Sequence, residues 1–368
     1  MEIVVRKSDL LKELQLVQGI VERKNSIPIL SNVLLEARDG RLHVSATDLE
    51  VSVRGGCPAQ VIAAGALTLG AKKFFEITRS LPESDIHLTE LPGAWAALEC
   101  ERVSMKVAGQ SADAFPSLPT AAAAAPGVAL PTDVLRELIA RTSFAITGED
   151  ARYYLSGALM LLSREGVVMV TTDGHRLSYA QRAATLDVAD PVRVLVPRKV
   201  IHELQQLLEG EETAVFRQSD NHLVFSVGER VLASKAVDGQ FPAFEKVVSV
   251  LGDKQVTLER ERLQSAVRRV SLLSSERSRA LKVTLEEGRL ELLASSPDLG
   301  EAKESLAVDY SGDAVEIGFN AQYIADFLAA AGTAQVRLEL RDQDSQGLLR
   351  PVGEGIADHR YVVMPMRL

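Results

Sequence analysis

Residues 39–48 read DGRLHVSATD, a turn glycine followed by a strand that alternates apolar and polar side chains and ends on small polar residues. Two further stretches have the same form, EGVVMVTTD at residues 165–173 and EGRLELLASS at residues 287–296. Their turn glycines lie 126 and 122 residues apart. The 368 residues therefore divide into three repeats of about 123 residues each. A threefold repeated chain is typical of a repeated surface, as in a ring or an array, whereas an enzyme usually needs one asymmetric site.

The segments around each stretch repeat as well. A helix is expected before each turn glycine, beginning near Ser8, Thr132 and Glu259, and the first two of these residues are suited to cap a helix N-terminus. A second helix is expected after each strand, at residues 71–76, 197–203 and 319–324. Each repeat thus reads as helix, strands, helix and strands, which predicts an α+β fold.

Proline-rich connectors mark the boundaries between the repeats. The segment FPSLP at residues 115–119 closes the first repeat, and FPAF at residues 241–244 closes the second. Between them, the alanine run at residues 121–125 is too short and too closely bounded by prolines to form a stable helix. We expect domains at residues 1–120, 131–244 and 245–368, with a linker at residues 121–130.

Composition limits the class of protein. The chain has 41 Lys and Arg against 50 Asp and Glu, a formal net charge of −9, which argues against a basic tail that binds nucleic acid. Cys57 and Cys100 are the two cysteines, so no disulfide framework is expected. The N-terminal apolar run is too short for a signal peptide, and no apolar stretch approaches the roughly 20 residues of a membrane span. We expect a cytoplasmic protein.

The sequence offers few residues for catalysis. The six histidines are scattered without metal-binding spacing, and neither a phosphate-binding loop nor a nucleophile elbow occurs. The densest polar group is Thr172-Asp173-Gly174-His175-Arg176. Because Thr47-Asp48 occupies the equivalent place in the first repeat without a histidine, we interpret the aspartate as a turn former. We expect no catalytic residue, no metal and no cofactor.

Basic residues gather on five of the six expected helices. They are Lys12, Lys72, Lys73, Arg79, Arg136, Arg141, Arg198, Lys199, Arg262, Arg268 and Arg269, whereas the sixth helix carries only Asp326. Such faces are usually just solvated. If they point into one shared space, that space is electropositive and attracts a phosphate backbone without reading bases.

Several ordered motifs resemble the β subunit of bacterial DNA polymerase III, the sliding clamp, along the whole chain. They are LSN at residues 30–32, ATDLE at residues 46–50, RYYLSG at residues 152–157, TTDGHRL at residues 171–177, VPRK at residues 196–199, DGQFP at residues 238–242, IGFN at residues 317–320 and the closing YVVMPMRL at residues 361–368. The resemblance implies three similar α+β clamp domains per chain, each with two helices packed on antiparallel sheets. It also implies a head-to-tail dimeric ring that encircles duplex DNA and tethers the replicative polymerase.

The resemblance further implies three functional surfaces. For DNA contact it points to Lys24, Lys73, Arg79, Arg152, Tyr153, Tyr154, Arg198, Lys199 and Lys246, with Glu149 a departure from the pattern. From sequence alone, the two tyrosines are more typical of a strand, and only the resemblance assigns them to DNA contact. For the dimer seam it points to Val103 and Met105 of one copy against Leu272 and Leu273 of the other, residues that also suit a domain core.

The third implied surface is a partner-peptide pocket formed by the second and third repeats. Its residues are Leu155, Thr172, Gly174, His175, Arg176, Leu177, Pro242, Val247, Asn320, Tyr323, Val362, Met364, Pro365, Met366 and Arg367, and residues 343–355 match the pattern less closely. Because proline cannot donate to a sheet ladder, Pro365 predicts that the C-terminal strand lies at a sheet edge rather than in the core. Met364 and Met366 are adaptable side chains suited to several partners.

The partners implied are double-stranded DNA without sequence preference, a second copy of the chain, the polymerase catalytic subunit, the clamp loader, and other polymerases and repair proteins that carry short linear motifs. No membrane partner is implied. Two other functions stay open from the residues alone. One is a DNA-binding regulator that forms no ring, and the other is an enzyme with an interdomain site at Asp173, His175 and Arg176.

Overall fold

The computed structural model describes residues 1–21, 27–119, 127–148, 155–219, 222–237, 239–250 and 252–367. The chain forms two compact units, Met1–Thr132 with Lys199–Ala236, and Asp133–Arg198 with Val237–Leu368. The second repeat is therefore shared between the two units.

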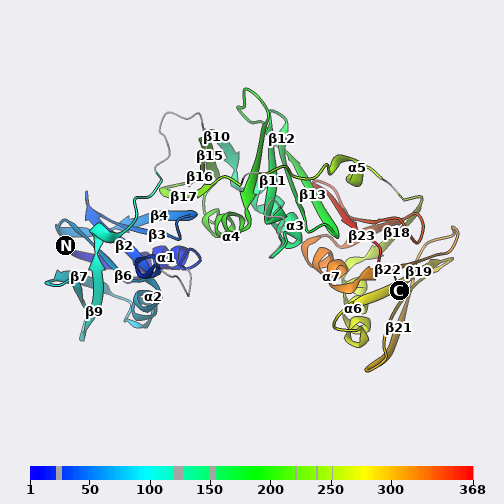
Figure 1. Cartoon of the computed structure of the whole chain (residues 1–368), viewed down its shortest axis with the longest axis horizontal. Helices are drawn as coiled ribbons and strands as arrows, with labels where there is room; N and C mark the ends of the chain where they lie inside the picture. Colours follow the sequence, from blue (N-terminus) through cyan, green and yellow to red (C-terminus); the bar gives the residue numbers. More distant parts are fainter. Residues whose placement is uncertain are drawn as a thin grey trace. The chain divides into compact units, whose positions relative to one another are not determined.

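The first unit is built on one antiparallel sheet with the strand order β10-β15-β16-β17-β4-β3-β2-β6-β9-β8-β7-β1-β5. The first repeat supplies β1 (Glu2–Arg6), β2 (Asn32–Arg38), β3 (Arg41–Thr47), β4 (Val51–Pro58), β5 (Gln60–Ala63), β6 (Gly65–Gly70), β7 (Asp85–Leu91), β8 (Trp95–Cys100) and β9 (Val103–Ser111). The second repeat supplies β10 (Val128–Pro131), β15 (Thr213–Ser219), β16 (His222–Val227) and β17 (Arg230–Lys235). Helices α1 (Lys7–Val17) and α2 (Ala71–Ser80) pack against each other (Figure 1).

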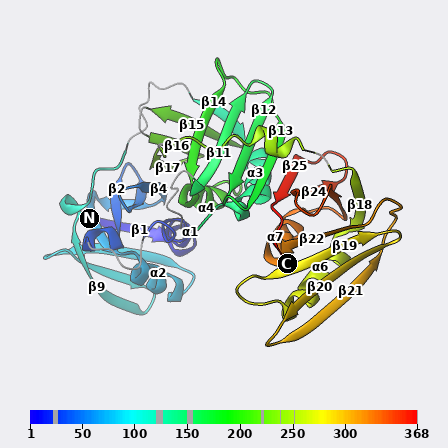
Figure 2. The same ribbon diagram turned by 45° about the vertical axis from the view of Figure 1, so that its right-hand side comes forward.

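The second unit contains an eight-stranded sheet, β14-β11-β12-β13-β25-β24-β23-β18, and a four-stranded sheet, β21-β20-β19-β22. Its strands are β11 (Gly157–Ser163), β12 (Gly166–Thr172), β13 (Arg176–Ala183), β14 (Val192–Pro197), β18 (Lys254–Glu259), β19 (Ala280–Glu286), β20 (Arg289–Ser296), β21 (Gly300–Ala307), β22 (Val315–Asn320), β23 (Gln335–Leu340), β24 (Gly347–Val352) and β25 (Asp358–Val363). The remaining helices are α3 (Thr132–Thr142), α4 (Arg198–Leu207), which begins at the boundary of the units, α5 (Glu245–Val248), α6 (Arg260–Val270) and α7 (Ala321–Ala330). Figure 2 shows α6 and α7 beside the four-stranded sheet of the third repeat.

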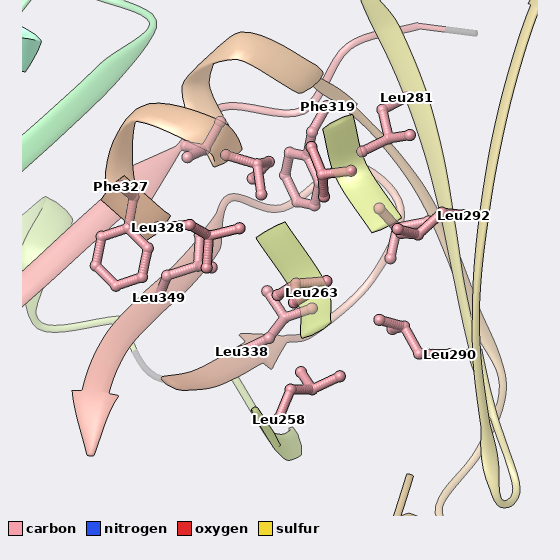
Figure 3. Packing of buried hydrophobic residues seen from close by; sticks show 14 of the residues in the cluster. Leu258, Leu263, Leu281, Leu290, Leu292, Phe319, Phe327, Leu328, Leu338 and Leu349 are labelled. Carbon is pink, nitrogen blue, oxygen red and sulfur yellow. The ribbon is translucent and has the colours of Figure 1, made fainter. Parts of the chain in front are cut away.

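The core of the third repeat lies between α6, α7 and the strands of both sheets. Leu263 of α6 lies beside Leu338 of β23, and Phe327 of α7 lies beside Leu349 of β24 (Figure 3). All four side chains are buried. Truncating one leucine in such a core costs about 2–5 kcal/mol, so the apolar face that the sequence predicts for each helix is what holds it on its sheets.

Sheet pairing joins the repeats in the same way twice. The last strand of the second repeat, β17, pairs with β4 of the first, with Leu232 opposite Val53. The last strand of the third repeat, β25, pairs with β13 of the second, with Val362 opposite Leu177. Strand β21 occupies the place in the third repeat that β4 and β13 occupy in the others, and it ends its sheet with β20 as its neighbour.

The structure confirms the expected helices but corrects three details. Ser8 does not cap α1: because β1 runs directly into the helix, Arg6 is the N-cap residue and gives no side-chain cap. Thr132 is the first residue of α3, and its hydroxyl donates to the carbonyl oxygen of Glu211. Strand β10 begins at Val128, inside the range expected as linker, because it pairs with β15. The remainder of the linker falls mainly outside the described residues.

Candidate functional site

A cavity of about 250 Å³ lies in the second unit, between the second repeat and the C-terminal strand of the third. We call it the apolar pocket. Its lining residues are Leu155, Thr172, Gly174, Arg176, Leu177, Pro242, Ala243, Phe244, Val247, Val362 and Met364. Leu155 precedes β11, and the lining residues 172–177 come from β12, β13 and the turn between them. The rest come from the connector and α5 and from β25 and the residue that follows it, so the pocket requires both repeats.

The floor of the pocket is fixed by apolar packing. Leu177 of β13 and Val362 of β25 are opposite one another in the sheet, and Phe244 of the connector packs into the same buried cluster. The ring of Phe244 also lies 6.0 Å from that of Tyr179. By contrast, the side chain of Met364 is 45% exposed. A rigid apolar floor beside an exposed, flexible methionine suits an apolar ligand of variable shape.

One wall is a turn that the sequence repeats. The Thr172 hydroxyl donates to the carbonyl oxygen of Arg176 over 2.6 Å, and a carboxylate oxygen of Asp173 accepts from the backbone N–H of His175 and of Arg176. In the first repeat, Thr47 and Asp48 make the corresponding bonds to residues 49–51. The prediction that Asp173 forms a turn is confirmed, since the same bonds occur in a copy that lacks the histidine.

Arg176 connects this wall to the third repeat. Its Nε donates to Asp173 over 3.0 Å, its Nη1 to Asp326 of α7 over 2.5 Å, and its Nη2 to the carbonyl oxygen of Phe144 over 2.7 Å. The guanidinium carbon lies 4.4 Å from the centre of the Tyr323 ring. Burial acts to lower the pKa of Arg176, but its interactions with Tyr361, Asp326 and Asp173 outweigh it, so the net shift is upward and the group stays cationic.

The C-terminal segment corrects one prediction. The strand β25 ends at Val363 and has neighbours on both sides, β13 and β24, so it is a core strand and not an edge strand. Pro365 lies beyond its end, where no ladder bond is needed. The segment is held by two backbone bonds, from Met364 to the carbonyl oxygen of His175 and from Met366 to that of Gly318.

Several residues expected in the pocket lie beside it. The side chain of His175 is exposed, Asn320 caps the N-terminus of α7, and Tyr323 is half-buried beneath Arg176. Pro365, Met366 and Arg367 line a neighbouring cavity of about 340 Å³, together with Glu316, Ile317, Gly318, Gln343 and Asp344. The wall around residues 343–355 also contributes Gln346, whose amide donates to the carbonyl oxygen of Val247 over 2.6 Å.

The pocket also contains two residues that sequence reasoning missed, Ala243 and Phe244. The signal was present, because the FPAF connector of residues 241–244 places two aromatic rings three positions apart. Both rings are buried and lie 6.4 Å apart, centre to centre.

The residues expected to contact DNA differ in their surroundings. Arg79, Arg198 and Lys246 are exposed, and Lys73 is exposed beside Glu76, with 2.7 Å between their charged groups. Lys199 instead pairs with Asp48 and donates to the carbonyl oxygen of Ile20 over 2.9 Å. Lys24, Glu149, Arg152, Tyr153 and Tyr154 lie outside the described residues.

Arg141 does not belong to a solvent-facing basic surface, contrary to the expectation from its helix. Its side chain is buried and donates to the carbonyl oxygen of Ala330 over 3.0 Å. Burial lowers the pKa of Arg141, while Glu137 acts to raise it. Its charge is therefore used inside the second unit.

The four residues expected at the dimer seam lie outside the buried core. Val103 and Met105 are half-buried on β9, Leu273 is half-buried in the short 3-10 turn Ser271–Leu273 that follows α6, and the Leu272 side chain is 73% exposed. An exposed leucine on a short turn of helix has no packing role within its own chain, so the alternative that Leu272 is a core residue is wrong.

The part of the chain that the structure describes offers neither a metal site nor a membrane-spanning helix. It contains no group of three or more His, Cys, Asp or Glu placed to hold a metal ion. Among the same residues, no helix is long and apolar enough to cross a membrane.

The sequence matches three families in succession. These are the N-terminal domain of the DNA polymerase III beta subunit at residues 1–119, the central domain at residues 129–243 and the C-terminal domain at residues 250–367. The chain belongs to the β sliding clamp family. The beta sliding clamp of Pseudomonas putida is 39% identical to it over the full length of both chains.

Solved clamp structures agree with the fold. The crystal structure of the DNA polymerase III subunit beta from Pseudomonas aeruginosa matches all of both chains with a TM-score of 0.92 and 36% identity. A clamp from the same organism bound to griselimycin matches equally completely, with a TM-score of 0.92 and 37% identity.

Membership of the family confirms the expected fold class and function. The chain is a sliding clamp built from three clamp domains, and dimeric rings are known for the family. It acts in DNA replication as the non-catalytic processivity subunit of the polymerase holoenzyme. Neither the DNA-binding regulator nor the enzyme is favoured.

Proposed function

We propose that this clamp holds its partners through short linear peptides that dock in the apolar pocket. The partners are the polymerase catalytic subunit, the clamp loader, and other polymerases and repair proteins. The observation that carries the proposal is the pairing of a buried floor, Leu177 and Val362, with the exposed side chain of Met364 at the edge of the same cavity.

The size and lining of the pocket set the kind of peptide and its affinity. A cavity of about 250 Å³ takes one or two apolar side chains. Each buried leucine or phenylalanine contributes about 1.5–3 kcal/mol before the cost of ordering the peptide. Two such anchors leave a net affinity on the order of micromolar, which allows partners to exchange.

The test is calorimetric titration with a peptide that has a glutamine followed by spaced leucine or phenylalanine residues. We expect micromolar binding, and loss of binding when both apolar anchors are replaced by alanine. Equal affinity of the two peptides would overturn the proposal, because binding would then not depend on the apolar floor.

We also propose that β21 of one copy pairs with β9 of another to close the ring. Within the chain, β4 pairs with β17 and β13 pairs with β25, in each case with the last strand of the following repeat. Strand β21 is the third strand of this type, and β9 is the last strand of the first repeat. Residues 103–108 of β9 pair with β8 on one side, and β6 joins the strand only from Gly109 onward. Residues 103–108 of β9 and strand β21 each have a strand neighbour on one side, which fits head-to-tail pairing of β21 with β9 of another copy.

The register follows from the equivalent pair β17 and β4. Both β8–β9 and β16–β17 are hairpins with two-residue turns, so Val103 corresponds to Arg230. Lys106 then corresponds to Ala233, which is opposite Ser52 of β4. Ser52 corresponds to Glu301 of β21, so this register sets Lys106 opposite Glu301 of the partner copy. Both side chains are exposed, and their opposite charges favour this register. Leu272 and Leu273 would lie near the same seam, since the turn that contains them contacts β21.

For DNA, we propose contacts from Lys73, Arg79, Arg198 and Lys246, and from Lys24, Arg152, Tyr153 and Tyr154. Exposure of the first four supports this. Lys199 contributes indirectly, because its ammonium group is engaged with Asp48. We further propose domains at residues 1–120, 131–244 and 245–368, which the matched family ranges support.

A further inference from the structure

The two joints between repeats are built on equivalent residues. The turn at Asp48 and the turn at Asp173 make the same backbone bonds. Helices α4 and α7 each follow the equivalent strand, and the sixth residue of each is acidic, Glu203 in α4 and Asp326 in α7. The joint between repeats one and two therefore serves as an internal reference for the joint that contains the apolar pocket.

Two differences separate the joints. In the first repeat, Val51 is the residue equivalent to Arg176, and Leu49 is the residue equivalent to Gly174. Leu49 and Gly174 share a left-handed backbone, with φ of 79° and 88°. Glycine adopts this conformation without strain, and it leaves open the space that a side chain would fill.

Arg176 determines whether the acidic residue at the sixth position of the helix has an ion-pair partner. Asp326 accepts from Arg176 over 2.5 Å and from the Gln322 amide over 2.7 Å, so each of its oxygens has a donor. Glu203, without an arginine at the equivalent place, is buried and its Oε2 has no hydrogen-bond partner in the described structure. The pocket joint thus connects helix and turn through the Arg176–Asp326 pair, whereas the first joint connects them through Lys199 of α4 and Asp48.

We propose that Asp326 is a positioning residue of the apolar pocket: by holding Arg176, it fixes the turn that forms one wall and anchors the C-terminal segment. This rests on the proposed function of the pocket. Asp326 does not line the cavity, whereas Arg176 does. The turn that Arg176 braces supplies Thr172 and Gly174 to the wall, and its His175 carbonyl oxygen accepts from the backbone of Met364.

Asp326 acts by preorganising the wall of the pocket. The Arg176 side chain is 10% exposed, and its charge is balanced by Asp173 and Asp326 from two different repeats. Removing the charge of Asp326 leaves Arg176 with its bonds to Asp173 and Phe144 and its contact with the Tyr323 ring, but without an ion pair to α7. The wall then samples conformations that do not fit the ligand. The apparent affinity for the peptide falls in proportion to the fraction of molecules whose wall still fits it.

The experiment compares Asp326→Asn with Asp326→Glu and with Gln322→Ala in the full dimeric clamp. The Asn variant keeps the shape and removes the charge, the Glu variant restores the charge, and the Gln322 variant removes the other bond to Asp326. We expect peptide affinity to fall about three- to tenfold for Asp326→Asn, to recover for Asp326→Glu, and to be unchanged for Gln322→Ala.

A second readout needs no peptide. Amide hydrogen exchange of residues 172–177 and 359–367 should become faster in Asp326→Asn, with sedimentation as a dimer and the melting temperature retained. If wild type binds no peptide, the proposed function of the pocket fails, while the exchange measurement still tests the positioning role. Wild-type affinity and unchanged exchange in Asp326→Asn would overturn the inference. So would equal losses in Asp326→Asn and Asp326→Glu.

Discussion

The backbone N–H of Met364 donates to the carbonyl oxygen of His175 over 2.9 Å. This bond fastens the end of the third repeat to the turn that closes β12 in the second. Because Met364 follows directly after the buried strand residue Val363, the chain passes from core to exposed surface within one residue. The pocket edge can therefore be altered without touching the sheet.

Deleting residues 364–368 should abolish peptide binding and leave the dimer intact. The truncation removes the exposed Met364 and its bond to the turn but leaves β25 complete. Titration calorimetry gives the affinity, and sedimentation gives the oligomeric state. Met364→Leu is the matched control and should bind normally, since it keeps a flexible apolar side chain. Unchanged affinity in the truncation would mean that the C-terminal segment is not part of the binding site.

Replacing Leu272 and Leu273 together by alanine should yield monomers. Leu272 is 73% exposed in the chain, so its truncation creates no cavity within the protomer. If both side chains are buried at the seam, each truncation costs about 2–5 kcal/mol of association free energy. Analytical ultracentrifugation at low micromolar concentration measures the effect, and a persistent dimer would show that the seam lies elsewhere.

A charge exchange tests the register of that seam. Lys106→Glu alone should weaken the dimer about tenfold, because it sets two carboxylates opposite each other. Adding Glu301→Lys should restore association. Lys282→Glu is the control, since Lys282 pairs with Glu316 on β22, inside its own sheet. Failure of the double variant to recover would rule out the register, even if the seam itself is correct.

Arg198 and Lys199, which begin α4, should respond differently to replacement by methionine. Lys199→Met leaves the Asp48 carboxylate, only 8% exposed, without its ammonium partner, and should cost about 1–3 kcal/mol of unfolding free energy. Arg198→Met should leave stability unchanged and reduce retention on DNA, because Arg198 is exposed. Chemical denaturation and DNA retention of both variants separate the two roles. If Lys199→Met is as stable as wild type but is retained weakly on DNA, Lys199 contacts DNA directly and this account of it is wrong.

Glu203 should make stability fall as pH rises. Burial raises its pKa from 4.5 to about 7, although Lys199 acts in the opposite direction. The folded state therefore keeps this proton to higher pH than the unfolded state does. The resulting stabilisation is complete below pH 4.5 and is lost as pH rises through about 7, a change of up to about 3 kcal/mol.

The isosteric variant Glu203→Gln tests this directly. It should flatten the dependence of the unfolding free energy between pH 5 and 8.5 and be more stable than wild type at pH 8. The exposed Glu209→Gln serves as the control and should keep the wild-type profile. A Glu203→Gln protein that is less stable at pH 8 would show that the carboxylate is needed in its charged form.

The sequence predicted what depends on local pattern and missed what depends on distant contacts. Turn glycines, apolar periodicity and the Thr-Asp turns follow from neighbouring residues, so the repeats and helices could be predicted. Ser8 could not be excluded as a cap, because that depends on β1 running directly into α1.

Tertiary partners explain the remaining differences. Arg141 and Lys199 look like surface bases until Ala330 and Asp48 are found beside them. Pro365 suggested an edge strand because the sequence does not show that the strand ends two residues earlier. Asp326 was noted only as the single acid on its helix, and its contact with Arg176 depends on two repeats meeting.

Retention on circular versus linear DNA tests the sliding-clamp function most directly. Clamp loaded by its loader onto a nicked circle should remain bound through gel filtration at elevated salt. It should be lost from the same DNA once a single cut makes it linear, because topology rather than tight contact holds it. Equal retention on both forms, or a marked preference for one duplex sequence, would contradict a ring that encircles DNA.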